Sequence, residues 1–108
     1  MPNSLHQVKA EFFKVLGHPA RIRVLELLAE RDRTVSELLP VVGVEASNLS
    51  QQLGVLRRAG VVLATKEGNT VSYSLASPVI GELLTVARRA LTGLLSDQVA
   101  ILDDLRAD

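Results

Sequence analysis

The stretch that decides the fold of this chain is Thr34–Tyr73, TVSELLPVVGVEASNLSQQLGVLRRAGVVLATKEGNTVSY. It opens with a capping box, in which the Thr34 hydroxyl can accept from the backbone N–H of Glu37 while the Glu37 carboxylate reaches back to the N–H of Thr34. A short helix with one apolar side follows, and Pro40 and Gly43 are expected to break it. The stretch therefore begins as a short helix and a turn.

A second helix follows this turn and has two chemically different faces. Leu49, Leu53 and Leu56 recur at helical spacing and are expected to face inward, and Gly60 stands where a C-terminal cap would end the helix. The opposite, outer face carries short or amide side chains without charge. Such a face suits base edges in a DNA major groove better than it suits bulk solvent, where Lys and Glu are the usual residues. An ordinary amphipathic helix with a polar outside is the alternative. The outer face carries uncharged donors and acceptors: Ser47, Asn48, Ser50, Gln51 and Gln52.

A β-hairpin is predicted directly after this helix. Residues 61–66 have the composition of one strand, 67–69 of a tight turn and 70–75 of a second strand. In the second strand, TVSYSL, hydroxyl side chains alternate strictly with apolar or aromatic ones, which is typical of a half-buried hairpin. Helix, turn, helix and hairpin is the order of a winged helix-turn-helix. We therefore predict a mainly α fold with about five helices and a two-stranded wing.

Three separate motifs make the chain similar to a known family. Residues 12–25, FFKVLGHPARIRVL, resemble the opening signature of the ArsR/SmtB family of bacterial winged-helix repressors. Residues 48–62, NLSQQLGVLRRAGVV, resemble its recognition helix and the exit from it, and residues 66–75, KEGNTVSYSL, resemble its wing. The similarity spans nearly the whole chain. It implies a homodimeric repressor in which the terminal helices build the dimer and the recognition helix meets double-stranded DNA.

Composition limits what else the chain can be. Its 108 residues predict a single domain over 1–108, with no room for a separate sensor or catalytic module. The formal net charge is zero, so a basic surface for DNA must be local. The absence of cysteine excludes disulfides, thiolate metal sites and cysteine redox switches. Without a signal-peptide pattern or an apolar run of bilayer length, we expect a cytoplasmic protein with no membrane partner.

Apolar residues recur along both ends of the chain. One helix is predicted over 5–16, and another from about residue 79 to 105 would be roughly 40 Å long. A domain this small cannot cover both sides of such a helix, and a large exposed apolar area normally marks an interface. Intramolecular packing alone is the alternative. We predict a homodimer whose interface includes eight apolar residues: Leu5, Val8, Phe12, Leu84, Leu91, Leu94, Leu95 and Leu102.

The positions that bind metal in the family carry poor ligands in this chain. ArsR-like metal sensors often have a Cys-x-Cys pair before the recognition helix, and the matching residues are Thr34 and Ser36. Other members place Asp and His ligands along the last helix, whereas residues 79–105 contain no histidine. His18 is expected to cap or pack at a helix start, and His6 is a lone residue near a terminus. We expect no transition-metal site and no cofactor. A metal-responsive repressor with an unrecognised site is the alternative, and a small-molecule effector of unknown identity is left open.

Two other functional classes, an enzyme and a protein-contact module, fit the residues less well than a DNA-binding regulator does. An enzyme is not expected, because the chain has no cysteine, two distant histidines and no glycine-rich phosphate loop. A winged helix used only for protein contact would present an aromatic or aliphatic anchor on the outer face of the helix near residues 46–58. Only Val55 comes close to such an anchor. The polar outer face favours DNA.

The expected segments are dimerisation helices over 1–18 and 79–108, a helix-turn-helix over 34–60 and a wing over 61–75. The N-terminal part of the recognition helix is expected to meet base edges, with glutamine able to pair bidentately with adenine. The base-edge candidates are Ser47, Asn48 and Gln51, and the phosphate or positioning candidates are Ser50, Gln52, Arg57 and Arg58. On the wing, the candidates are Lys66, Asn69 and Tyr73, the last of which has a core-edge position as its alternative.

Overall fold

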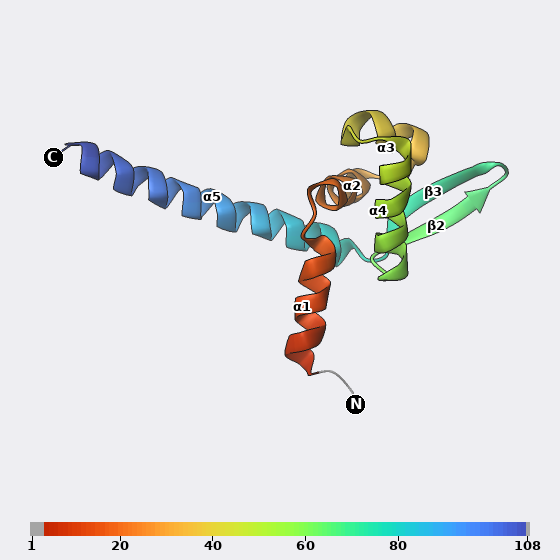
Figure 1. Ribbon diagram of the computed structural model, residues 1–108, viewed down its shortest axis with the longest axis horizontal. Helices are drawn as coiled ribbons and strands as arrows, with labels where there is room; N and C mark the ends of the chain where they lie inside the picture. Colours follow the sequence, from red (N-terminus) through yellow and green to blue (C-terminus); the bar gives the residue numbers. More distant parts are fainter. Residues whose placement is uncertain (1–3, 108) are drawn as a thin grey trace.

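The computed structural model describes residues 4–107; the first three residues and the last residue of the expected domain lie outside the described part. Figure 1 shows a body made of α2, α3, α4 and the hairpin, from which α1 and α5 project as two arms. The expectation of a mainly α fold with five helices and a wing is confirmed. The elements are α1 (Leu5–Leu16), α2 (Pro19–Glu30), β1 (Arg33–Thr34), α3 (Val35–Val42), α4 (Ala46–Arg58), β2 (Val62–Glu67), β3 (Thr70–Leu75) and α5 (Pro78–Ala107).

Local capping explains where the first two helices begin. In α1, the Ser4 hydroxyl accepts from the N–H of Gln7 at 3.2 Å, and the Gln7 side-chain oxygen accepts from the N–H of Ser4 at 2.9 Å. In α2, Nδ1 of His18 accepts from the N–H of Ala20 at 3.1 Å, so this histidine caps the helix as expected. Pro19 occupies the first turn, where a missing N–H costs no intrahelical bond.

The third helix begins as predicted and ends later than predicted. The capping box forms between Thr34 and Glu37, with both hydrogen bonds present. The expectation that Pro40 breaks the helix is wrong, because α3 continues through it to Val42. Pro40 removes only the hydrogen bond to the carbonyl of Ser36, and both residues are exposed, so water can satisfy that carbonyl. Gly43, with φ of +75°, ends the helix instead.

The hairpin belongs to a three-stranded antiparallel sheet in the order β1-β3-β2. The expected wing of two strands therefore needs a correction: β1 adds to its base, where Arg33 pairs with Tyr73 and Thr34 with Ser72. Gly68, with φ of +62°, makes the tight turn between β2 and β3. Because β3 is the central strand, Ser72 is half-buried rather than solvated, and the strict alternation of burial expected in this strand is lost.

One apolar core holds the body together. It lies between α2, α3, α4 and the root of the sheet, and Leu16 at the end of α1 closes one side of it. Since the core is made of leucine and valine, shape and burial rather than aromatic stacking stabilise it. The side chains with less than 2% of their surface exposed are Leu25, Leu38, Leu49, Leu56, Val24 and Val62.

Only the first turns of α5 join this core. Ile80, Leu83 and Leu84 pack against it. Gly81 makes the approach to α2 close, because a Cβ at this position would lie 3.0 Å from the Cβ of Ala29. From residue 85 to residue 107 every side chain is exposed, and Figure 1 shows this part of α5 running away from the body. The helix is 30 residues long and has no buried residue.

The dimensions of the free chain reflect these arms. Its radius of gyration is 17.5 Å, whereas a compact domain of this length has about 13 Å. It exposes 7779 Å² of surface, against about 5,900 Å² for a compact protein of the same mass. The excess is concentrated on α1 and α5, where most of the exposed large apolar side chains lie.

Candidate nucleic-acid interface

Helix α4 lies across the front of the body in Figure 1, and one of its faces is exposed along its length. Its N-cap is Glu45, which makes no side-chain capping bond, so the first N–H groups of α4 stay available to another acceptor. At the other end, Gly60 has φ of +77° and turns the chain into β2. Leu49, Leu53 and Leu56 anchor the inner face in the core, as the helical spacing predicted.

The outer face of α4 is polar and, towards its C-terminal end, basic. The exposed polar and basic side chains of this face come from successive turns of one helix. None of them has a side-chain hydrogen bond or ion pair to the rest of the described residues. They are therefore free to bond to another molecule. The exposed residues are Ser47, Ser50, Gln51, Arg57 and Arg58.

The placement of Gln52 on this outer face was wrong. Gln52 is only 7% exposed, and it is the buried polar residue of the core. Its side-chain oxygen accepts from Nε of Arg21 at 2.9 Å, and its side-chain nitrogen donates to Oδ1 of Asn48 at 2.9 Å. A polar side chain at a core position is tolerated because both ends are hydrogen-bonded. Gln52 thus lies behind the exposed face and cannot itself reach a phosphate.

Asn48 occupies the border between these two environments. It is half-buried at the third position of α4, next to the exposed Ser47. Its oxygen is already used by Gln52, whereas its side-chain nitrogen makes no hydrogen bond among the described residues. Asn48 is thus the one amide side chain of α4 that belongs partly to the interior and partly to the surface.

Gly54 shapes the outer face in a way that the sequence analysis did not anticipate. A Cβ at this position would lie 3.1 Å from Nη1 of Arg58, so the Arg58 guanidinium lies back along α4 over the glycine. A glycine inside a helix costs about 1 kcal/mol relative to alanine. A glycine at this position is therefore unexpected, and an arginine stands four residues after it. Together they are the sequence signal that the Arg58 side chain occupies the space above Gly54.

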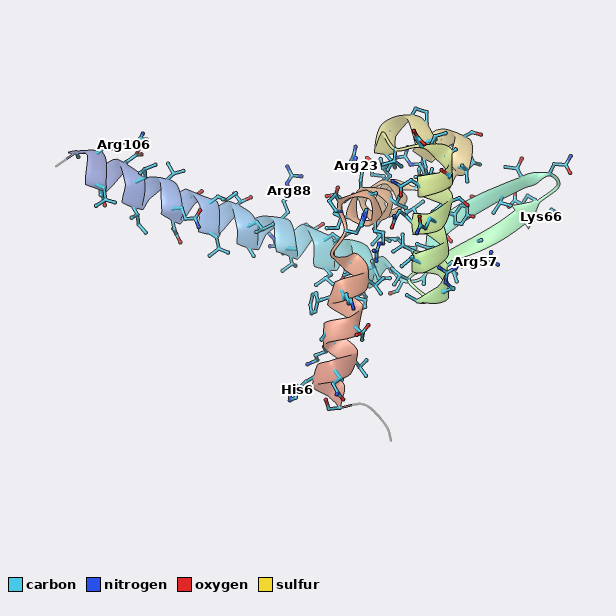
Figure 2. All side chains as sticks on the ribbon, in the orientation of Figure 1. His6, Arg23, Arg57, Lys66, Arg88 and Arg106 are labelled. Atoms are coloured by element: carbon cyan, nitrogen blue, oxygen red, sulfur yellow. The ribbon has the colours of Figure 1, made fainter. Side chains whose placement is uncertain are left out.

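The wing extends the exposed surface beyond α4. Lys66 lies near the outer end of β2, and Asn69 lies in the turn; both are exposed. Figure 2 shows Arg57 at the end of α4 beside the hairpin, with Lys66 farther out along it. Tyr73 is half-buried and packs against the core, which favours its core-edge alternative over a phosphate contact.

Ion pairing leaves the positive charge of this surface uncompensated. The salt bridges of the described residues all lie elsewhere: Arg23 with Glu26, Arg31 with Glu37, and Arg33 with Glu30. Although the chain as a whole is neutral, the end of α4 therefore presents a local basic face. Local positive charge of this kind attracts phosphate oxygens.

The residues expected in a dimer interface fall into two groups. Phe12 and Leu84 are half-buried and pack against the chain's own core. Phe13, which the sequence analysis did not select, is 57% exposed and meets the Phe12 ring edge-on at 5.6 Å. No partner chain tests the interface, which stays a prediction. The other candidates are from 46% to 65% exposed: Leu5, Val8, Leu91, Leu94, Leu95 and Leu102.

The described part of the chain groups no three His, Asp or Glu side chains that could hold a metal ion. The Thr34 hydroxyl accepts a capping hydrogen bond in α3, and Nδ1 of His18 accepts one in α2. His6 is exposed on α1. None of the helices between residues 4 and 107 combines the length and hydropathy needed to cross a membrane.

Known proteins share both the sequence and the fold. The family model described as bacterial regulatory protein, arsR family, matches residues 18–63. The uncharacterized HTH-type transcriptional regulator Rv0081 of Mycobacterium tuberculosis is 67% identical over 104 residues, covering 95% of this chain and 91% of the relative. Its crystal structure superposes with a TM-score of 0.84 at 65% identity, covering 91% of this chain and 99% of that one.

Proteins of lower sequence identity have a similar sequence or the same fold. A probable mercury resistance operon repressor of Streptomyces lividans is 31% identical over 94 residues, covering 87% of this chain and 72% of the relative. A homodimeric winged helix-turn-helix DNA-binding domain, Mb0332 of Mycobacterium bovis, shares the fold with a TM-score of 0.74 at 24% identity, covering 88% of this chain and 93% of that one. The chain therefore belongs to the ArsR/SmtB family of winged helix-turn-helix transcriptional regulators.

Proposed function

We propose that this protein is a homodimeric repressor that binds an inverted-repeat operator without responding to transition metals. The observation that carries the proposal is the pairing of a polar, exposed face on α4 with an uncovered apolar face on α5. The first suits a major groove, and the second suits a copy of the same chain.

The excess surface supports self-association. A stable interface buries about 800 Å² from each partner, and the free chain exposes well over that amount beyond the surface expected for its mass. Leu91, Leu94 and Leu95 lie on a helix with no core of its own, so a second copy is the simplest cover for them. The homodimeric state of Mb0332, which has the same fold, is consistent with this arrangement.

Each protomer would place α4 in a major groove. Ser47 and Gln51 lie on the exposed N-terminal half of α4, where a recognition helix meets base edges, and we assign them to sequence readout together with Asn48. Ser50, Arg57 and Arg58 would contact phosphates. Lys66 and Asn69 on the wing would contact the backbone or the minor groove. Tyr73 supports the wing from the core edge.

The protein-contact alternative lacks a supporting feature on α4. Val55, the nearest approach to an apolar anchor, is half-buried instead of prominent. The proposal of repression without a metal signal is supported by the chemistry at the family's ligand positions, where Thr34 caps a helix and Ser36 is a weak ligand for soft metals.

The test is selection of bound fragments from genomic DNA by the purified protein, followed by footprinting. We expect one protected region with two half-sites related by a dyad, about one helical turn or a small multiple apart. Sedimentation of the same preparation at low micromolar concentration should give a dimer. Uniform binding to all fragments, or a monomer at that concentration, would refute the proposal.

A further inference from the structure

Three hydrogen bonds connect the end of α1 to the surface of α4. Nη1 of Arg21 donates to the carbonyl of Val15 at 2.9 Å, and Nε of Arg21 donates to the side-chain oxygen of Gln52 at 2.9 Å. The side-chain nitrogen of Gln52 donates to Oδ1 of Asn48 at 2.9 Å. All three bonds are partly buried, and Arg21 and Gln52 are 31 residues apart in the chain. We call this set the Arg21–Gln52–Asn48 relay.

The direction of the relay is dictated by the guanidinium group. Arginine has five N–H donors and no acceptor, so Gln52 must turn its oxygen towards Arg21. The Gln52 nitrogen, which can only donate, then points at Asn48 and obliges Asn48 to turn its oxygen inward. Each amide orientation follows from the one before it. The arginine thereby decides which end of the Asn48 amide is left over.

The end left over is the NH2 group of Asn48. No buried side-chain polar atom of the described residues lacks a partner. Since the Asn48 nitrogen has no partner within the chain, it must reach solvent at the surface of α4. An asparagine free to use both ends pairs bidentately with adenine, accepting from N6 and donating to N7. Because the Asn48 oxygen is turned towards the buried Gln52, Asn48 does not present both ends of its amide to one base edge.

We propose that Asn48 reads DNA as a donor only, and that Arg21 and Gln52 are positioning residues that impose this polarity. In the major groove, a lone donor fits the keto bases: guanine offers N7 and O6, and thymine offers O4. Cytosine offers only an amino donor, and adenine places its amino donor beside its single acceptor N7, so a lone donor gains less from these amino bases. The inference rests on the proposed function, and it specifies that one position of each half-site holds a keto base.

The isosteric substitution Gln52→Glu tests this polarity. The introduced carboxylate has acceptors at both ends, so one oxygen can still accept from Arg21 while the other can only accept from Asn48. Asn48 then turns its NH2 inward and presents its oxygen to DNA. The expected result is an inverted preference, from a keto base to an amino base on the contacted strand. The position concerned is the operator base pair at which Asn48→Ala removes the base preference.

The measured quantity is the ratio of dissociation constants for two operators that differ only at this base pair. A uniform repulsion between the added charge and DNA cancels in this ratio. We expect the ratio to change from about tenfold in favour of the keto base to several-fold in favour of the amino base, the scale of one hydrogen bond at a base edge. The matched control is Ala59→Glu, which adds the same charge at an exposed residue just past the end of α4, to which no contact with DNA is assigned, and it should leave the preference at this position unchanged.

Asn48→Asp provides a second route to the same result. It keeps the hydrogen bond from Gln52 and presents an acceptor to DNA, so it should also favour an amino base even if Gln52→Glu fails to fold. An unchanged keto preference in either folded variant would overturn the inference, as would an Asn48→Ala variant that flattens no position. A wild-type protein that shows no sequence preference would instead refute the proposed function.

Discussion

The body and the two arms of this molecule differ in how their apolar side chains are covered. In the body, α2, α3 and α4 bury their leucines against one another and against the sheet, so that Leu25, Leu38, Leu49 and Leu56 have no exposed surface. In α5, leucines recur with the same regularity, yet Leu91 is 58% exposed. An apolar helical pattern therefore predicts burial, but the covering surface need not belong to the same chain.

The contact between the two regions shows how the boundary is made. Gly81 lets α5 lie against Ala29 of α2, and beyond Leu84 the helix leaves the body. The body thus buries its own apolar side chains, together with Leu16 and the first turns of α5, whereas the rest of α5 depends on what covers it. The predictions below separate these two kinds of stability, starting with the largest expected effect.

Charging the apolar face of α5 should have the largest effect. We expect Leu91→Lys with Leu94→Lys to abolish the dimer, because unpaired charges in an apolar interface cost several kcal/mol. The measurement is sedimentation at low micromolar concentration. Ser96→Lys with Ala100→Lys is the matched control on the opposite side of the helix and should leave the dimer intact. A double Leu variant that still sediments as a dimer would remove α5 from the interface.

Truncation in the body should reduce stability without regard to association. Leu56→Ala should lower the free energy of unfolding by about 2–5 kcal/mol, because Leu56 is fully buried and the vacated volume persists as a cavity. This loss should be the same at all protein concentrations in denaturant melts corrected for dissociation. Leu95→Ala, at an exposed site, should instead act through the dissociation constant of the dimer. Equal behaviour of the two variants would contradict the division into body and arms.

Substitutions on α4 should separate base readout from phosphate binding. Gln51→Ala should cost on the order of 1–3 kcal/mol on the preferred operator and relax one base position per half-site. Arg57→Ala with Arg58→Ala should weaken binding to every sequence and flatten its salt dependence, because phosphate contacts release counterions. Binding titrations at several salt concentrations measure both effects. If Gln51→Ala with Ser47→Ala left sequence preference intact, α4 would not be the recognition helix.

A smaller effect is expected from the carboxylate that caps α3. The N–H of Thr34, and next the Arg31 guanidinium at 2.8 Å, lower the pKa of Glu37 from 4.5 to about 2. Its ionisation therefore stabilises the fold fully above pH 4.5, and this contribution is lost as the pH falls through about 2. Thermal melts of wild type and Glu37→Gln should converge over that interval. Curves that stay parallel would show that Glu37 is not coupled to folding.

The smallest expected effect is that of metal ions. Stoichiometric zinc, cadmium, nickel or cobalt should leave operator affinity unchanged, because the residues at the thiolate positions of the family are Thr34 and Ser36. DNA-binding titrations with and without each ion measure this. Saturable binding of one ion per protomer with more than about tenfold loss of DNA affinity would be a coupling of roughly 1.4 kcal/mol and would reverse the proposal.

Local features of this molecule followed well from sequence. The Thr34–Glu37 capping box, the His18 cap at the start of α2 and Gly60 after α4 all appear where expected. Each depends on backbone hydrogen bonds and φ angles within a few residues. The exposure of Ser47 and Gln51 also followed, because the three leucines of α4 define its inner face and leave the opposite side to solvent.

Three features depended on surroundings that the local sequence does not define. Gln52 lies at the edge of the apolar stripe, and burial of its amide depends on Arg21, on another helix, as well as on Asn48 of its own helix. Strand β1 exists because β3 has a free edge beside it. Pro40 stays in a helix because the carbonyl that it leaves unpaired faces water.

The sequence by itself determined the order of the helices and of the two hairpin strands, the caps named above and the family, since these depend on neighbours along the chain. Only the tertiary structure decided which polar side chains of α4 turn inward and which end of Asn48 is left free. The physical reason is that a hydrogen bond has a direction. Periodicity tells which face of a helix is buried, but the orientation of an amide is decided by whether its partner donates or accepts.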